Sequence, residues 1–266
     1  MASVPYTVLT VPQWQGSGAA NARALSAGSR SAGRLVGGAS LVEVPITEAA
    51  GEMRDGVRSL HQLVANLGAI ERALAKVSGP VLTIGGECSV DLGPLAAAHS
   101  RYGDDLTVLW IDAHPDVYAP GELESGSFHA MILRTLLGEG PALLVPRHPL
   151  APKQVRLAGR RVGGDPELAF LARSGLRHHG VDDFEQVLED LTGPVYLHID
   201  LDVLDPADFR SVGYSEPDGV TAERLIALVR NVAGLVGAAI CEYAPGPTPV
   251  LAEENVIRGV AAALQF

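Results

Sequence analysis

The chain has 266 residues, of which 47% are hydrophobic and 19% are charged, and its formal net charge at pH 7 is −11. This length and composition can bury a sizeable core, which excludes general disorder and predicts one large α/β domain over residues 1–266. The acidic balance, with a pI near 5.1, argues against a nucleic-acid partner, because phosphate binding needs clustered Lys and Arg.

Short apolar runs alternate with amphipathic stretches along the chain. Several of these runs are continuous, which is typical of strands covered on both faces. The predicted strands are Tyr6–Thr10, Ser40–Val44, Val81–Ile84, Leu106–Ile111, Gln154–Leu157, Leu176–His179, Val195–Ile199 and Gly237–Cys241. The predicted helices include Met53–Lys76, Pro166–Ser174, Asp182–Leu191, Thr221–Val232 and Glu253–Leu264, and Thr221 is expected to be an N-cap. Gly and Pro predict loops at Ala119–Ser127 and Pro141–Pro152. This alternation predicts a parallel sheet.

The cysteines and the apolar runs bear on where the protein works. Cys88 and Cys241 lie far apart in the chain, which is not the pattern of a disulfide framework. The sequence shows neither a targeting signal nor an apolar run long enough to span a bilayer. We therefore expect a cytoplasmic protein without a membrane partner.

Three predicted strands end in polar clusters, and open parallel sheets hold ligands at the carboxyl ends of their strands. The clusters are Gly85–Ser89, Asp112–Asp116 and Asp200–Asp202. Residues i and i+2 of an extended segment point the same way, so Asp112, His114 and Asp116 are expected to converge, and so are Asp200 and Asp202. Buried, unpaired carboxylates are costly, and divalent cations compensate them. Oxygen and imidazole ligands favour Mn²⁺, with Fe, Co, Ni and Zn as alternatives.

These clusters resemble the signatures of the ureohydrolases, the family of arginase, agmatinase, guanidinobutyrase, proclavaminate amidinohydrolase and formimidoylglutamase. The family patterns are GGDHS, DAHxD and DxDxxDP. The chain has GGECS at 85–89, DAHPD at 112–116 and DLDVLDP at 200–206. The resemblance covers nearly the whole chain and implies a three-layer α/β/α sandwich around an eight-stranded, mostly parallel sheet.

The resemblance also implies a site with two metal ions, Mn²⁺ by preference, that share a hydroxide. Asp112 and Asp200 would bridge the two ions. Asp116 and the residue at position 88 would complete the shell of the first ion. His114 and Asp202 would complete the shell of the second.

Two further residues acquire catalytic roles from the resemblance. The segment Ser125–His129 is similar to the family pattern SGxxH, which makes His129 the proton shuttle for the leaving amine. An ordinary histidine pKa near 6.5 suits that role. Glu242 stands where the family places a glutamate that pairs with the substrate guanidinium, a planar fork of N–H donors. The implied reaction converts a guanidino compound to urea, or a substituted urea, and an amine.

The chain departs from the family pattern at residues that hold metal and substrate. Cys88 replaces the usual histidine, and it either ligates as a thiolate or packs as a small apolar residue beside a half-occupied site. Glu87 replaces an Asp behind the ligands. Tyr118 and Ser127 stand where arginases carry Asn residues that bind the α-carboxylate of arginine. Together with Ser125 and Glu242, they are the residues expected to bind the substrate. Plain L-arginine is therefore disfavoured against agmatine, guanidinobutyrate, Nω-hydroxyarginine or a larger guanidino metabolite.

Three alternatives stay open: hydrolysis of formimidoylglutamate, a catalytically weak homologue that binds metal or ligand for regulation, and a deacetylase-like hydrolase with one metal. By resemblance the expected assembly is a homo-oligomer, a trimer or a hexamer. The remaining histidines match no site pattern and are interpreted as surface or core residues: His61, His99, His148, His178, His179 and His198.

The departure at position 88 is directly testable. Cys88→His is expected to raise Mn²⁺ occupancy, because imidazole suits Mn²⁺ better than a soft thiolate does. Metal analysis of the purified variant beside the wild type measures this, and unchanged occupancy would count against a ligand role for position 88.

Overall fold

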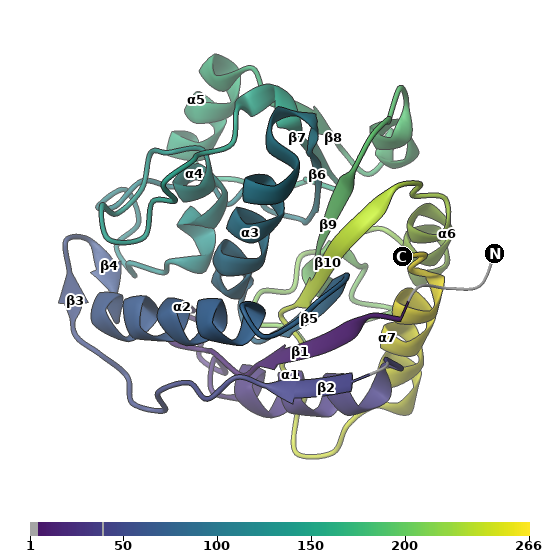
Figure 1. Ribbon diagram of the computed structural model, residues 1–266, viewed down its shortest axis with the longest axis horizontal. Helices are drawn as coiled ribbons and strands as arrows, with labels where there is room; N and C mark the ends of the chain where they lie inside the picture. The colour runs from purple at the N-terminus through teal and green to yellow at the C-terminus, as the bar shows by residue number, and fades with distance from the viewer. Residues whose placement is uncertain (1–4, 39) are drawn as a thin grey trace.

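The computed structural model describes residues 5–38 and 40–266, and its centre is one eight-stranded sheet with helices on both faces (Figure 1). The strands are β1 Thr7–Val11, β2 Ser40–Glu43, β5 Val81–Gly85, β6 Thr107–Ile111, β7 Val155–Ala158, β8 Arg177–His179, β9 Val195–Asp200 and β10 Leu235–Cys241. They pair in the order β2-β1-β5-β10-β9-β6-β7-β8, and every pair is parallel. All eight strands predicted from the sequence are confirmed, each within two residues at either end.

Strand side chains alternate between two hydrophobic cores, one on each face of the sheet. In β6, Leu109 and Ile111 join one core, whereas Val108 and Trp110 join the other. Helices α1 Ala24–Leu35, α6 Ala222–Arg230 and α7 Leu251–Ala263 cover the first core. Helices α2 Leu60–Leu74, α3 Leu92–Tyr102, α4 Ile132–Leu136 and α5 Asp165–Ser174 cover the second. The predicted three-layer α/β/α sandwich is therefore confirmed.

Two helix predictions were wrong in part. The helix expected from Met53 begins only at Leu60, because a hairpin of β3 Met53–Arg54 and β4 Val57–Arg58 precedes it. Asp55 and Gly56 form its turn with φ values of 51° and 74°, the left-handed pair that an Asp-Gly hairpin turn requires.

The helix expected over 182–191 is a short 3₁₀ segment, η5 Phe184–Leu188. The carboxylate of Asp183 accepts hydrogen bonds from the backbone N–H of Gly180 and from the ring of His179. It therefore tightens the preceding turn instead of capping an α-helix. The prediction at Thr221 was correct, since its hydroxyl accepts from the N–H of Arg224 at 3.3 Å. The other 3₁₀ segments are η1 Cys88–Asp91, η2 Gly103–Asp105, η3 His129–Met131, η4 Pro152–Gln154 and η6 Leu201–Val203.

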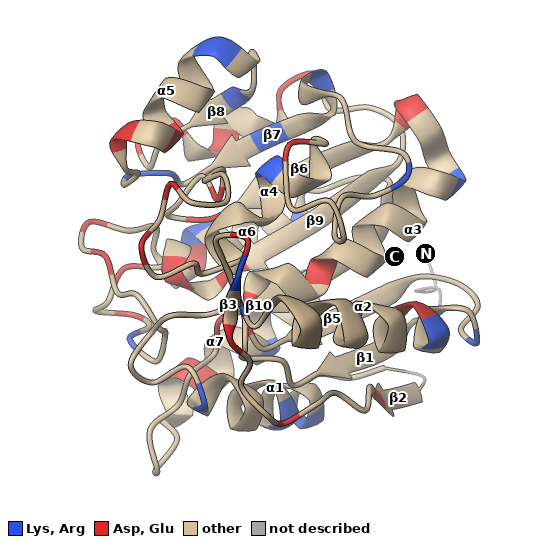
Figure 2. Cartoon of the chain, turned by 90° about the vertical axis from the view of Figure 1, so that its left-hand side faces the viewer, with Lys and Arg blue, Asp and Glu red and all other residues tan. Residues whose placement is uncertain are grey.

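The four central strands bring the chemistry to one edge of the sheet. β5, β10, β9 and β6 are neighbours in that order, and the polar clusters and Glu242 follow their carboxyl ends. In Figure 2 most charged residues lie in helices and loops, and acidic loop segments gather on the side toward which the arrowhead of β1 points. Within the described residues, no helix is long and apolar enough to cross a membrane.

One arginine ties together two of the loops at this edge. The guanidinium of Arg161, in the loop after β7, donates to five backbone carbonyls at 2.8–3.3 Å. These acceptors belong to Asp202, Val203, Leu204, Glu216 and Pro217. The planar fork of donors thus fixes the turn that carries Asp202.

Removal of this tie is expected to loosen the carboxyl edge. In Arg161→Ala the carbonyls that accepted from the guanidinium lose their hydrogen-bond donor. The free energy of unfolding should therefore fall by about 2–3 kcal/mol. Urea denaturation measures the loss. Arg230→Ala, an exposed position, is the control and should stay within about 0.5 kcal/mol of the wild type; equal effects at the two sites would contradict the tie.

Candidate metal centre and active site

A cavity of about 310 Å³ opens beyond the carboxyl ends of β6 and β9. Its lining consists of His114, Asp116, Tyr118, Leu123, Ser125, Ser127, His129, Ala130, Glu167, Asp200, Asp202 and Tyr214. Eight of the residues predicted for the site are among them. The other three, Cys88, Asp112 and Glu242, are outside this lining and almost completely buried.

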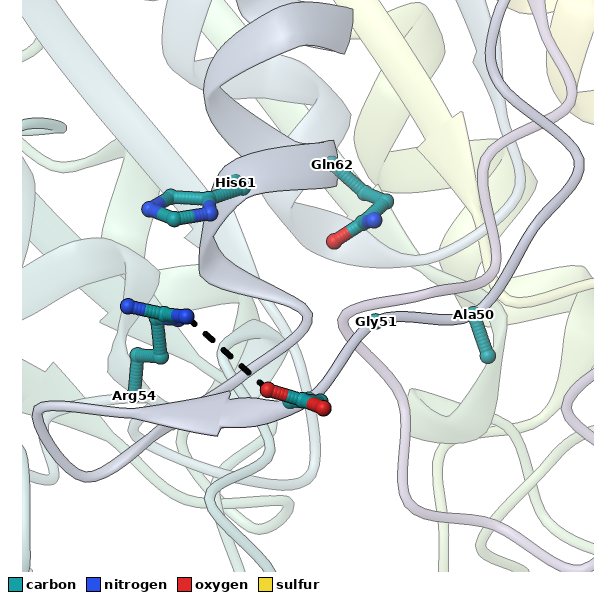
Figure 3. A pocket seen from close by; sticks show the side chains of 6 residues that line it. Ala50, Gly51, Arg54, His61 and Gln62 are labelled. Atoms are coloured by element: carbon teal, nitrogen blue, oxygen red, sulfur yellow. Dashed lines mark ion pairs between the residues drawn. The ribbon is translucent and has the colours of Figure 1, made fainter.

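A second hollow, of about 420 Å³, holds none of the predicted site residues. It lies at the β3–β4 hairpin and is lined by Ala50, Gly51, Glu52, Arg54, His61 and Gln62 (Figure 3). Arg54 and Glu52 form an ion pair there at 3.9 Å, with both side chains exposed. The convergent acidic groups are therefore in the smaller cavity.

Asp112, His114 and Asp202 meet at one point, with a ligand atom of each within 4.8 Å of the others. His114 Nδ1 lies 2.9 Å from Asp202 Oδ2 and 3.5 Å from Asp112 Oδ1. Burial lowers the pKa of His114, but the carboxylates of Asp202 and Asp112 outweigh it and raise that pKa well above its usual value. Asp112 and His114 come from one predicted cluster and Asp202 from the other, whereas Asp116 belongs to none of the ligand groups found among the described residues.

A second group forms around Cys88. Its Sγ donates to Asp200 Oδ2 at 3.0 Å, and Cys88, Asp200 and Glu242 again place ligand atoms within 4.8 Å of one another. Burial, with the neighbouring acids, raises the pKa of the Cys88 thiol well above its usual value. Burial likewise raises the pKa of Asp116 and Asp200, and nearby carboxylates raise it further.

The buried acids are short of cationic partners. In the part of the chain that the structure describes, His114 is the one cationic side chain within ion-pair distance of the carboxylates of Asp112, Asp116, Asp200 and Asp202. Carboxylate, imidazole and thiol groups are also the ligand types that divalent metals take. The donor set therefore fits divalent cations.

His129 and Glu242 form a buried pair beside this cluster. His129 Nδ1 lies 3.0 Å from Glu242 Oε1, which also accepts from the N–H of Cys88 at 3.3 Å. Glu242 Oε2 has no partner among the described residues, and Glu242 holds a left-handed φ of 69°. Burial lowers the pKa of His129, but the carboxylates of Glu242 and Glu87 outweigh it and raise that pKa.

Three of the residues predicted to contact the substrate, Tyr118, Ser125 and Ser127, are part of the cavity lining. Ser125 and Ser127 share a hydrogen bond between their hydroxyls at 2.8 Å. The hydroxyl of Tyr118 lies close against Gly164, where a Cβ would come within 2.0 Å of it. Tyr118 therefore packs on the loop before α5, where the lack of a side chain at Gly164 leaves room for the tyrosine hydroxyl. Its ring narrows the cavity.

Three further residues near this site are not in the set predicted from the sequence. Tyr214 forms an aromatic wall, with ring centroids 5.5 Å from His129 and 6.3 Å from His114. Glu167 lines the cavity and accepts from the N–H groups of Val117 and Gly164, while burial raises its pKa to about 6. His198, assigned no role from the sequence, is fully buried in β9 two residues before Asp200. Two of these carried a signal in the sequence: His198 in its spacing from Asp200, and Glu167 in its place in the segment after the fifth predicted strand.

The parallel sheet and the acidic cavity define an α/β protein with a metal-binding cluster at the carboxyl edge. A model of the arginase family matches residues 18–258. Arginase of Bacillus caldovelox is 30% identical over 248 residues, 84% of this chain and 82% of that enzyme. Arginase of Neurospora crassa is 30% identical over 213 residues, 70% of this chain but 60% of that enzyme. The solved arginase of Bacillus subtilis subsp. subtilis str. 168 has a TM-score of 0.83 at 22% identity, over 98% of both chains. The chain therefore belongs to the arginase family, hydrolases that act on the C–N bonds of linear amidines.

The buried acids make the response to cations depend on pH. The raised pKa values of Asp112, Asp116 and Asp200 mean that these three groups favour the metal-free fold at low pH, and that this contribution is lost as pH rises through those values. For Asp202 the effect of burial is outweighed by His114, so the pKa of Asp202 is lowered instead. At a hundredfold excess over its Kd, an added divalent cation should raise the Tm of chelated protein by roughly 5–10 °C. The rise should be larger at pH 7.5 than at pH 5.5, because protons compete for the same oxygens.

Thermal unfolding of chelated protein with and without Mn²⁺ at the two pH values measures this effect. Asp112→Asn should lose most of the rise, whereas Asp104→Asn, at an exposed position, should keep it. A rise that is larger at pH 5.5, or that is equal in both variants, would contradict the expectation.

Proposed function

We propose that the chain hydrolyses a guanidino compound to urea, or a substituted urea, and an amine, at the cavity beyond β6 and β9, with two divalent cations bound. The observation that carries this proposal is the meeting of buried, cation-poor carboxylates at that cavity in a chain of the arginase family. When bound, such ions supply Lewis acidity and a source of hydroxide at neutral pH. One sheet that takes strands from Thr7 to Cys241 supports a single domain over residues 1–266.

The proposed ligands follow from the two clusters. Asp112 and Asp200 are placed between the two ions. Cys88 and Asp116 belong to the first ion, on the side of the Cys88–Asp200 contact. His114 and Asp202 belong to the second, in keeping with their 2.9 Å approach.

The cavity favours a cationic substrate without a carboxylate next to its reacting end. Its lining is acidic and, among the described residues, contains neither Lys nor Arg. A guanidinium is attracted there, whereas the α-carboxylate of arginine would face Glu167 without a charged donor. Agmatine is therefore proposed ahead of L-arginine. Tyr118, Ser125 and Ser127 are the proposed contacts along its chain.

His129 and Glu242 are the proposed catalytic side chains. Against the effect of burial, Glu242 and Glu87 raise the pKa of His129. This favours its imidazolium form more than in an ordinary histidine, which suits a group that protonates a leaving amine. Glu242 orients that ring through Nδ1. Its second oxygen, which is buried and has no partner among the described residues, is the proposed acceptor for a guanidinium N–H.

Urea release with agmatine, guanidinobutyrate and L-arginine, after loading with Mn²⁺, Fe²⁺, Co²⁺, Ni²⁺ or Zn²⁺, tests the proposal. We expect agmatine to give the highest kcat/KM. His129→Asn should lower kcat by about 10²–10⁴-fold, the usual contribution of a proton-transfer group. His99→Asn, on α3 and outside the cavity lining, is the matched control.

The same samples separate the competing functions. Formamide release from formimidoylglutamate would move the proposal to that substrate. Folded, metal-loaded protein that is inactive on every substrate would overturn the proposed hydrolysis and favour a binding role.

A further inference from the structure

A buried histidine lies beneath the candidate metal centre and has no role in the function proposed so far. His198 is fully buried in β9, and its ring stacks on Trp110 of β6 with a centroid distance of 3.6 Å and an interplanar angle of 7°. The two residues are paired across the strands. Each precedes a carboxylate by two positions, Asp112 after Trp110 and Asp200 after His198, so the side chains share one face of the sheet.

One nitrogen of this ring is already engaged. His198 Nδ1 lies 2.9 Å from Asp91 Oδ2, and Asp91, itself fully buried, also accepts a hydrogen bond from the hydroxyl of Tyr196. A carboxylate accepts, so Nδ1 carries the proton and Nε2 presents a lone pair. Nε2 has no partner among the described residues. A buried polar atom left unsatisfied in this way costs about 1–3 kcal/mol.

The ring of His198 lies among ligand-forming groups. A ring nitrogen of His198, the Sγ of Cys88 and a carboxylate oxygen of Asp112 lie within 4.8 Å of one another. Because Asp91 occupies Nδ1, Nε2 is the nitrogen available to a cation there. Metal–ligand bonds of about 2.0–2.3 Å place neighbouring ligands about 3–4.5 Å apart, so this spacing needs little adjustment.

We propose that His198 ligates the first metal ion through Nε2 and that Asp91 is the positioning residue that orients its ring. The inference rests on the metal centre of the proposed function and adds a ligand to it. A carboxylate that holds the second nitrogen of a metal-bound histidine is a recurrent arrangement that fixes the tautomer and strengthens the ligand. The family pattern GGDHS has a histidine at the position of Cys88. In this proposal His198 supplies that imidazole to the same metal ion.

The added ligand changes the metals that the first position prefers. A thiolate and an imidazole beside carboxylates form a softer and more nitrogen-rich set than carboxylates alone. Such a set favours Zn²⁺, Fe²⁺ or Co²⁺ over Mn²⁺. We therefore expect the first position to hold Co²⁺ or Zn²⁺ more tightly than Mn²⁺.

Metal stoichiometry tests the role of His198. Chelated protein is loaded with Co²⁺, desalted and analysed by elemental mass spectrometry. The wild type should retain about two ions per chain and His198→Asn about one. Asp91→Asn should weaken the binding of one ion by about 10–100-fold, as loss of an orienting group usually does.

His99 provides a matched control. It is also a buried histidine with Nδ1 on a backbone carbonyl, that of His148, and with Nε2 unpartnered among the described residues. It belongs to none of the metal-ligand groups found among those residues. His99→Asn should therefore retain both ions.

A measurement on the intact wild type keeps the test independent of whether the variants fold. Proton NMR of the Co²⁺ form should show two hyperfine-shifted exchangeable imidazole N–H signals, from His114 and His198. A single signal in the two-ion wild type overturns the inference. Folded His198→Asn that binds both ions as tightly as the wild type overturns it too, and leaves the proposed function standing. A wild type that binds no cation overturns the metal centre and both proposals.

Discussion

Negative charge buried at the carboxyl edge of β6 and β9 is the constraint on which the rest of the site depends. Backbone N–H groups satisfy one oxygen of Asp112, Asp200 and Asp202, at 2.6, 2.7 and 3.2 Å respectively. These backbone bonds fix the direction of each carboxylate, and they leave His114 as the one cationic side chain among the described residues that offsets the mutual repulsion across the cluster. The backbone therefore holds these carboxylates in place on its own, so the proposed cations would enter a geometry that is already set.

Much of the fold was predictable because strands and helices have different periods. Central strands such as β6 and β9 are short, continuous apolar runs, and that property made them visible in the sequence. The errors lie where a local contact decides the structure. The left-handed turn at Asp55 and Gly56 interrupts a hydrophobic pattern that otherwise suits a helix. The hydrogen bonds of the Asp183 carboxylate stabilise a turn where a helix over 182–191 was expected. Neither effect appears in hydrophobic periodicity.

The candidate site divides in the same way. Asp112, His114, Asp200 and Asp202 were predictable as a group because they follow strands at i, i+2 spacing. Tyr214 was not, because a loop brings it to the cavity and no pattern marks it. His198 lay between these cases. Its spacing from Asp200 was visible in the sequence, whereas its partner Asp91 comes from another strand–helix connection and is placed only by the fold.

Glu242 has a consequence that reaches into folding. A left-handed backbone at a residue with a Cβ costs about 1–2 kcal/mol. Two residues of the candidate site adopt it, Glu242 with φ at 69° and Asp116 with φ at 54°. The carboxyl edge is thus locally frustrated: its backbone conformations and its like charges both oppose the compact state that the hydrophobic layers impose. The two cores supply the stability that permits this, so a sequence could lose the chemistry of this edge and become easier to fold.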